Sequence, residues 1–169
     1  MLVLSGGTVV DSDGAREADV HIEDGAITAV ETDGGSSVSA DAEEIDISGK
    51  YVCPGLIDAH VHLMFDGRPD PGSTTDQSEF ELAYRAAANC RAALDAGVTT
   101  VRDLGAPDTL ALDAGRLIEE GVIEGPRVLA CGENVVMTGG HGNWFGREAD
   151  GAGEVRKAVR EQLAGGPRS

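Results

Sequence analysis

Basic residues are scarce in this sequence, which has 13 Lys and Arg against 30 Asp and Glu, a net charge of -17. Only Lys50 and Lys157 are lysines. Phosphate binding requires a basic face, so the composition disfavours a nucleic-acid partner. The acidic residues are spread along the chain, which disfavours an acidic interaction tail. The mutual repulsion of these carboxylates destabilises the fold at low salt, whereas at 1 M salt it is screened within ~3 Å. The composition therefore favours a protein from a high-salt cytoplasm.

Long hydrophobic runs are also missing, so no stretch is long enough to span a membrane, and no membrane partner is expected. The first residues carry no positive charge of the kind that precedes the apolar part of a signal peptide. We therefore expect a cytoplasmic protein. A hydrophobic content of 41% indicates a folded chain with a core.

Cysteine is rare, and Cys53, Cys90 and Cys131 form no C-x-x-C pair. Neither a zinc ribbon nor a disulfide framework is indicated. We expect three small buried residues in a reducing compartment.

Residues 1–50 show short apolar runs separated by turn residues, which is typical of a small β-layer of sandwich type. Asp24-Gly25 lies between two such runs and predicts a hairpin, whereas Gly6-Gly7 predicts a turn between two strands. His21 has acidic residues on both sides and is expected at the surface. The expected strands are 2–4, 8–10, 18–23, 26–30 and 44–47, with a loop over 33–42.

From residue 51 onward, short apolar strands alternate with helical patterns. Ser78 is a plausible N-cap for the first helix, and Gly97 follows its end. Such alternation predicts a parallel sheet with crossover helices, an α/β fold. The expected strands are 51–62, 98–102 and 127–130, and the expected helices are 79–96, 108–120 and 153–163.

His60 and His62 stand at the end of the first of these strands. Side chains alternate along a strand, so the two imidazoles would share one face. Neutral imidazole is the commonest protein ligand for a catalytic metal, and barrel enzymes place their chemistry at strand ends. The alternatives are two half-buried strand histidines or an exposed pair at a sheet edge.

Residues 49–63, which read GKYVCPGLIDAHVHL, resemble the first barrel strand of the metal-dependent amidohydrolase superfamily. Residues 98–105 (VTTVRDLG) and 125–132 (GPRVLACG) resemble the second and third strands. Residues 137–142 (MTGGHG) resemble a loop of the branch with Xaa-Pro dipeptidase-like and imidazolonepropionase-like enzymes. The resemblance implies a β-sandwich part over 1–50, followed over 51–169 by about three βα units of a TIM-type (β/α)8 barrel.

The resemblance also implies a reaction. His60 and His62 would bind the more buried of one or two divalent metals, usually zinc. Metal-activated water would attack the carbonyl carbon of a small amide or dipeptide substrate, and the C–N bond would break. The general base, an aspartate after the last barrel strand, is expected beyond Ser169. His141 matches a loop histidine that contacts substrate, the alternative being a loop residue packed against Trp144.

Two aspartates are expected to support the histidines. Asp58 would orient a ligand histidine or cap the loop after the strand. Asp103 would also lie just behind the ligand histidines without binding the metal itself, or it would form a structural ion pair with Arg102 near the barrel mouth.

The sequence shows three barrel strands where the family has eight. The family's next strand ends in a metal-bridging lysine, and Lys157, inside a helix pattern, cannot be that residue. We therefore expect a truncated amidohydrolase with open sheet edges, which favour association, including homo-oligomers. The alternative is an inactive fragment or a metal-binding or interaction module without turnover. A nucleotide-binding domain is disfavoured because no Gly-rich loop joins the first strand directly to a helix.

Overall fold

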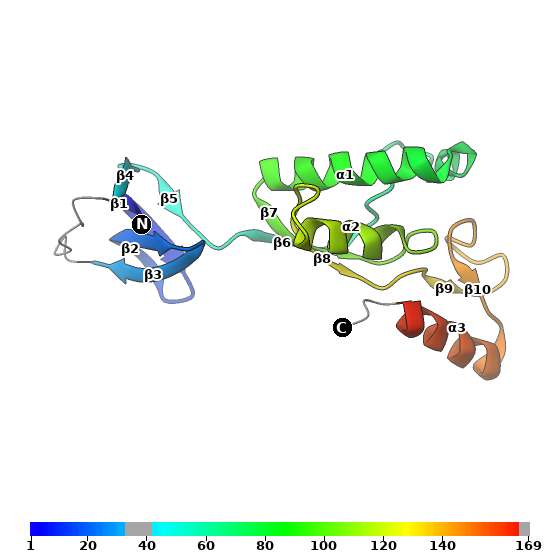
Figure 1. Ribbon diagram of the computed structural model, residues 1–169. Helices are drawn as coiled ribbons and strands as arrows, with labels where there is room; N and C mark the ends of the chain where they lie inside the picture. The colour runs from blue at the N-terminus through cyan, green and yellow to red at the C-terminus, as the bar shows by residue number, and fades with distance from the viewer. Residues whose placement is uncertain (33–41, 166–169) are drawn as a thin grey trace. The chain divides into compact units, whose positions relative to one another are not determined.

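The structure is a computed structural model that describes residues 1–32 and 42–165. Its contacts divide the chain into two units, Met1–Pro54 and the part from Gly55 onward (Figure 1). Within the described residues, no helix combines the length and the apolar character needed to cross a membrane.

The first unit is built on one mixed sheet in the order β3-β2-β1-β4, with β5 also paired to β1. Antiparallel pairing joins β1 to β2 and β2 to β3, whereas β4 and β5 run parallel to β1. Its core contains Val9, Ala18 and Val20. The strands are β1 (Leu2–Asp11), β2 (Gly14–Glu23), β3 (Ala26–Glu31), β4 (Glu43–Asp46) and β5 (Tyr51–Val52).

The first two expected strands are one strand in the structure, so the turn predicted at Gly6-Gly7 was wrong. β1 keeps its pairing with β2 across a register shift between Leu4 and Gly7, and Gly6 has a φ of 73°. A glycine with positive φ suits a β-bulge as well as a turn. The hairpin at Asp24-Gly25 is confirmed, with φ values of 50° and 76° that match a two-residue turn.

His21 is buried, which corrects the expectation of a surface residue. β2 lies between β3 and β1, and its register with β3 shifts between His21 and Ile22. Val20 and His21 are both buried, although neighbours on a regular strand face opposite sides. The register shift breaks the regular alternation of side chains along β2, which is consistent with the burial of both Val20 and His21.

Of the loop expected over 33–42, residues 33–41 lie outside the described part.

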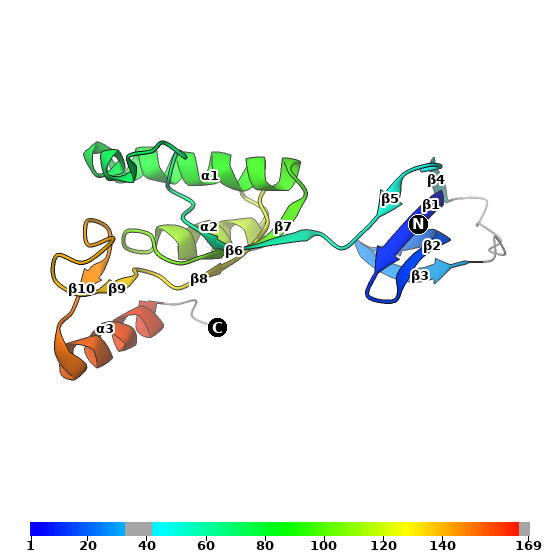
Figure 2. The ribbon, with the colours of Figure 1, turned by 180° about the vertical axis from the view of Figure 1, so that it is seen from behind.

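The second unit contains a parallel sheet in the order β6-β7-β8. Helices α1 and α2 lie side by side over this sheet, as both views show (Figures 1 and 2). The elements are β6 (Leu56–Val61), α1 (Glu79–Asp95), β7 (Val98–Asp103), α2 (Leu110–Glu119), β8 (Arg127–Ala130) and α3 (Gly151–Gly165). This is the strand–helix alternation that the sequence predicts.

The strand expected over 51–62 is interrupted. Tyr51 and Val52 form β5 and pair with β1, and β6 begins only at Leu56. Pro54 lies in the gap and has no N–H to donate to a sheet. Cys53 in the gap and Cys131 after β8 are exposed, so the expectation of burial was right only for Cys90.

The segments that connect β6 to α1 and β8 to α3 contain short regular elements. They are a 3-10 helix, η1 (Pro71–Asp76), and the paired strands β9 (Val135–Val136) and β10 (Arg147–Glu148).

The core of the second unit lies between the sheet and the two helices. Leu63, Cys90 and Val101 are buried in one cluster, and Met64 and Leu82 in another. Leu56 and Ile57 of β6 and Leu129 of β8, by contrast, are more than half exposed. The sheet therefore presents apolar side chains that the described residues do not cover.

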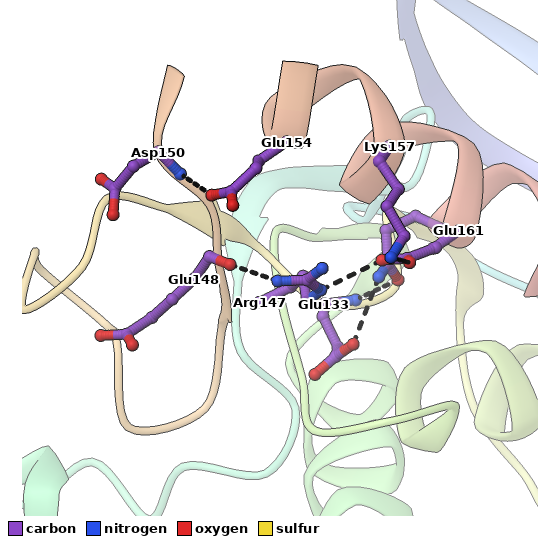
Figure 3. Close-up of polar contacts among 8 residues, drawn as sticks. Glu133, Arg147, Glu148, Asp150, Glu154, Lys157 and Glu161 are labelled. Carbon is purple, nitrogen blue, oxygen red and sulfur yellow. Dashed lines mark hydrogen bonds and ion pairs between the residues drawn. The ribbon is translucent and has the colours of Figure 1, made fainter. Parts of the chain in front are cut away.

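Charged side chains connect α3 to the segment that carries β9 and β10 (Figure 3). Arg147 donates from Nε to Glu161 at 3.0 Å and from Nη1 to the Glu148 carbonyl oxygen. Gln162 accepts a hydrogen bond from the Glu133 N–H at 2.9 Å. These contacts fix the third helix relative to the strands before it.

Candidate metal centre

The ends of β6 and β7 meet where the candidate residues lie. Val61 is aligned with Asp103 across the two parallel strands, and the Leu104 N–H donates to the Val61 carbonyl oxygen at 3.1 Å. His62 follows Val61 directly. The loops after these parallel strands therefore leave the sheet at one edge, as in a barrel active face.

His60 and His62 are close to each other, with ring centroids 5.5 Å apart in an edge-to-face arrangement. His62 Nδ1 lies 2.8 Å from the carbonyl oxygen of Gly105. A carbonyl oxygen only accepts, so this bond requires Nδ1 to carry the proton. In the neutral ring, Nε2 then keeps its lone pair and can ligate a metal.

The Asp103 carboxylate is fully buried and binds two backbone amides. Its Oδ2 accepts from the Leu63 N–H at 2.8 Å, and its Oδ1 accepts from the Gly105 N–H at 2.9 Å. Burial raises the pKa of Asp103, and these two amides and the nearby histidines oppose that rise.

The ion pair expected between Arg102 and Asp103 was wrong. Arg102 is exposed, and its Nε donates to the Ala59 carbonyl oxygen at 2.8 Å. Neighbouring residues on a strand face opposite sides of the sheet, so the two side chains point apart.

Asp58 binds the backbone before the site. Its Oδ1 accepts from the His60 N–H at 3.1 Å, a turn-like bond between residues two apart. His60 lies inside β6, which ends at Val61, so this bond stays within the strand and does not cap the loop that follows it. Within the described part of the chain, Asp58 makes no hydrogen bond to a histidine ring; its bond is to the backbone N–H of His60.

A series of aromatic contacts runs from His62 to His141. The His62 ring lies 5.3 Å from Phe145, Phe145 lies 5.6 Å from Trp144, and Trp144 lies 5.9 Å from His141. His141 is exposed, in edge-to-face contact with Trp144. The structure thus brings the loop of His141 to the β6 end through Phe145.

Sequence reasoning missed several residues that shape the site. Phe65 contacts the His62 ring at 5.0 Å, and Asn89 of α1 donates to the carbonyl oxygens of Leu63 and Phe65 at 2.8 and 2.7 Å. Gly105 acts through its backbone carbonyl, which no side-chain pattern reveals. A polar Asn89 inside the apolar stripe of a helix was the one available signal.

Both imidazoles have the chemistry of metal ligands, and the hydrogen bond of His62 Nδ1 gives that ring the tautomer that leaves Nε2 free to bind. Catalytic zinc typically takes three protein ligands. Among the described residues, however, no group of three or more His, Cys, Asp or Glu side chains is placed to hold a metal ion. The described part therefore offers a pair of donors for such a site, not a whole ligand set.

The sequence pattern of the amidohydrolase family matches residues 51–169. The chain belongs to this family. It is 42% identical over 102 residues to a dihydroorotase from Trichlorobacter lovleyi, a match that covers 59% of this chain and 21% of that protein. It is 34% identical over 115 residues to an L-hydantoinase from Paenarthrobacter aurescens, covering 67% and 22% of the two chains.

Solved structures give the same family relationship. A prolidase complexed with N-methylphosphonate-L-proline is 31% identical with a TM-score of 0.86, and the match covers 98% of this amidohydrolase chain and 44% of the prolidase. A putative prolidase from Bifidobacterium longum is 32% identical with a TM-score of 0.77, covering 98% and 38%. The fold is thus the N-terminal portion of an amidohydrolase TIM barrel, and the chain spans about a fifth of these curated relatives and less than half of these solved ones.

Proposed function

We propose that this chain supplies His60 and His62 to the divalent metal site of a hydrolase that cleaves C–N bonds in small amides or dipeptides. The observation that carries the proposal is the His62 Nδ1 bond to the Gly105 carbonyl, which turns Nε2 into the available ligand atom. A divalent metal held there would lower the pKa of a bound water to about 7 and polarise the scissile carbonyl.

Side chains around the pair support this role. Phe65 and Phe145 contact the His62 ring, and such apolar neighbours restrict the access of water to it. His141 is exposed on the loop that Trp144 and Phe145 connect to His62, which suits contact with a substrate. The further metal ligands and the general base would come from barrel strands beyond the three described here.

The substrate class rests on family membership and on the relatives. The dihydroorotase and the L-hydantoinase are named for cyclic amides, and the solved prolidase holds a proline-containing phosphonate. We infer an amide or dipeptide substrate, with zinc as the metal. Zinc accepts imidazole ligands in tetrahedral sites, which is consistent with this donor pair.

Zinc binding by the 169-residue chain is the direct test, measured by competition with a chromophoric chelator. His60→Ala and His62→Ala should each weaken binding by at least ~10-fold, since each removes a ligand. His141→Ala is the matched control, because this exposed histidine lies outside the pair. Equal zinc affinity in all variants would overturn the proposal.

Turnover tests the second half of the proposal. The protein that contains this chain should hydrolyse Xaa-Pro dipeptides or acyl-amino acids with zinc, and His60→Ala should abolish the rate. His141→Ala should raise KM more than it lowers kcat, because it removes substrate contact. Zinc binding through the pair without turnover on any amide would favour the alternative, a metal-binding module.

A further inference from the structure

The carboxylate of Asp103 joins the two chain segments that determine where the His62 ring sits. One oxygen accepts from the N–H of Leu63, the residue after His62, at 2.8 Å. The other accepts from the N–H of Gly105 at 2.9 Å, and the carbonyl of that same Gly105 receives the His62 ring. The Asp103 side chain therefore fixes both the backbone next to His62 and Gly105, whose carbonyl accepts from the His62 ring.

From this arrangement we propose that Asp103 is a positioning residue that sets the tautomer of His62 through Gly105. The proposal rests on the proposed function, in which His62 Nε2 is a metal ligand. Asp103 acts without touching the metal or the substrate.

The surroundings of Asp103 require a side chain with two acceptor oxygens. Both oxygens are buried acceptors, and each faces an N–H donor from a different segment. Gly105 has a φ of 146°, and a Cβ there would lie 2.8 Å from the Asn134 side chain. The loop that presents the carbonyl is thus confined on one side by Asn134 and held on the other by Asp103.

Asp103→Asn keeps the shape of the side chain and removes one acceptor. The Asn side chain has one oxygen, so its NH2 group must face one of the two backbone N–H donors. Whichever N–H it faces, either the Leu63 backbone beside the imidazole or the Gly105 segment that presents the carbonyl to Nδ1 loses its hydrogen bond. Asp150→Asn is the matched control, because Asp150 also accepts a backbone N–H, that of Thr138 at 3.3 Å, in a different loop.

Long-range 1H–15N NMR of the metal-free 169-residue chain at alkaline pH reports the tautomer of the neutral ring directly. The His62 signals are assigned by their loss in His62→Gln. We expect the Nδ1–H form in the wild type and a fall of roughly tenfold in its ratio to the Nε2–H form in Asp103→Asn, the effect of one buried hydrogen bond. Zinc affinity should fall by ~10-fold in the same variant. Asp150→Asn should change neither.

The tautomer of His62 tests the positioning role of Asp103, and zinc affinity tests the proposed function separately. A wild-type His62 protonated on Nε2, or a folded Asp103→Asn chain with the wild-type tautomer, overturns the positioning role. An Nδ1–H tautomer that depends on Asp103 in a chain that binds no zinc supports that role and counts against the proposed function. If Asp103→Asn does not fold, amide exchange in the wild type decides. Strong protection of the Leu63 and Gly105 amides supports the role, and rapid exchange overturns it.

Discussion

A Cβ atom placed on Gly55 would lie 1.9 Å from Thr99 Oγ1 and 2.6 Å from Thr99 Cβ. The start of β6 therefore runs against β7 at a distance that leaves no room for a side chain. Gly55→Ala should destabilise the second unit by about 1–3 kcal/mol, the usual result of overpacking. Urea unfolding followed by circular dichroism measures the change.

The control for this substitution is Gly153→Ala. Gly153 lies in α3 with nothing within 4 Å of an added Cβ, so alanine should be neutral or stabilise by up to about 1 kcal/mol. Adding Thr99→Gly to Gly55→Ala removes the opposing atoms and should recover part of the lost stability. Unchanged stability in Gly55→Ala alone would mean that the two strands are not this close.

Local signals in the sequence predicted most elements of the second unit. β8 covers Arg127–Ala130, as expected, and α1 begins after the predicted N-cap Ser78. Apolar runs and capping residues act within a few positions of one another, so a single sequence reveals them. The bulge in β1 was missed because it depends on a partner strand, which the residues at Gly6-Gly7 do not identify.

The sequence nominates His60 and His62 as candidate ligands through their spacing and strand position, and this assignment stays a prediction. The sequence does not reveal the residues that hold His62 in place. The contacts of His62 with Gly105 and of Leu63 with Asp103 join residues 43 and 40 positions apart. Such pairings follow from the alignment of β6 with β7, which is a property of the folded sheet.

The capping box at the start of α1 predicts a measurable loss on substitution. Glu81 N–H donates to Ser78 Oγ at 3.3 Å, and the Ser78 N–H donates to the Glu81 carboxylate at 2.8 Å. Ser78→Ala should cost about 0.5–2 kcal/mol in the free energy of unfolding. Thr109→Ala is the control, because the N-cap of α2 makes no side-chain capping bond, and it should cost less than about 0.5 kcal/mol.

The same capping box should depend on pH. The hydrogen bonds from the Ser78 N–H and hydroxyl lower the pKa of Glu81 below its ordinary value. A group whose pKa is lowered by folding stabilises the fold above its unfolded pKa, and that contribution is lost as the pH falls through the folded value. The stability difference between wild type and Glu81→Gln should therefore be larger at pH 7 than at pH 3. A difference that grows on acidification would contradict this assignment.

The three cysteines should react very differently. Cys90 is fully buried, and burial raises its pKa to about 11. Cys53 and Cys131 are exposed, although partial burial of the sulfur also raises the pKa of Cys131. At pH 8, iodoacetamide should modify Cys53 in the folded chain, Cys131 more slowly, and Cys90 only after unfolding. Peptide mass spectrometry identifies the modified positions. Equal modification of Cys90 in the folded chain would show that its surroundings are open.

Alkaline pH tests the same burial through stability. Folding raises the pKa of Cys90 to about 11, so the buried neutral thiol stabilises the fold. This contribution to stability is fully present at any pH below the unfolded pKa of the thiol. That contribution is lost as the pH rises toward the folded value. Wild type should therefore lose more stability than Cys90→Ala between pH 8 and pH 11, as measured by urea unfolding. Cys53→Ala, which removes an exposed thiol, should follow the wild type.

The acidic excess predicts stabilisation by salt. The chain carries 30 acidic and 13 basic residues, and Arg16, Arg85 and Arg116 are already engaged in ion pairs with neighbouring aspartates. The surplus carboxylates therefore repel one another across the surface, and raising the salt from 0.1 to 1 M shortens the screening length from ~10 to ~3 Å. Tm should rise with KCl, by ~2–4 °C for each ~1 kcal/mol of repulsion removed. Sucrose at matched osmolality controls for general exclusion effects, and a Tm that is flat or falls with KCl would remove the basis for a high-salt protein.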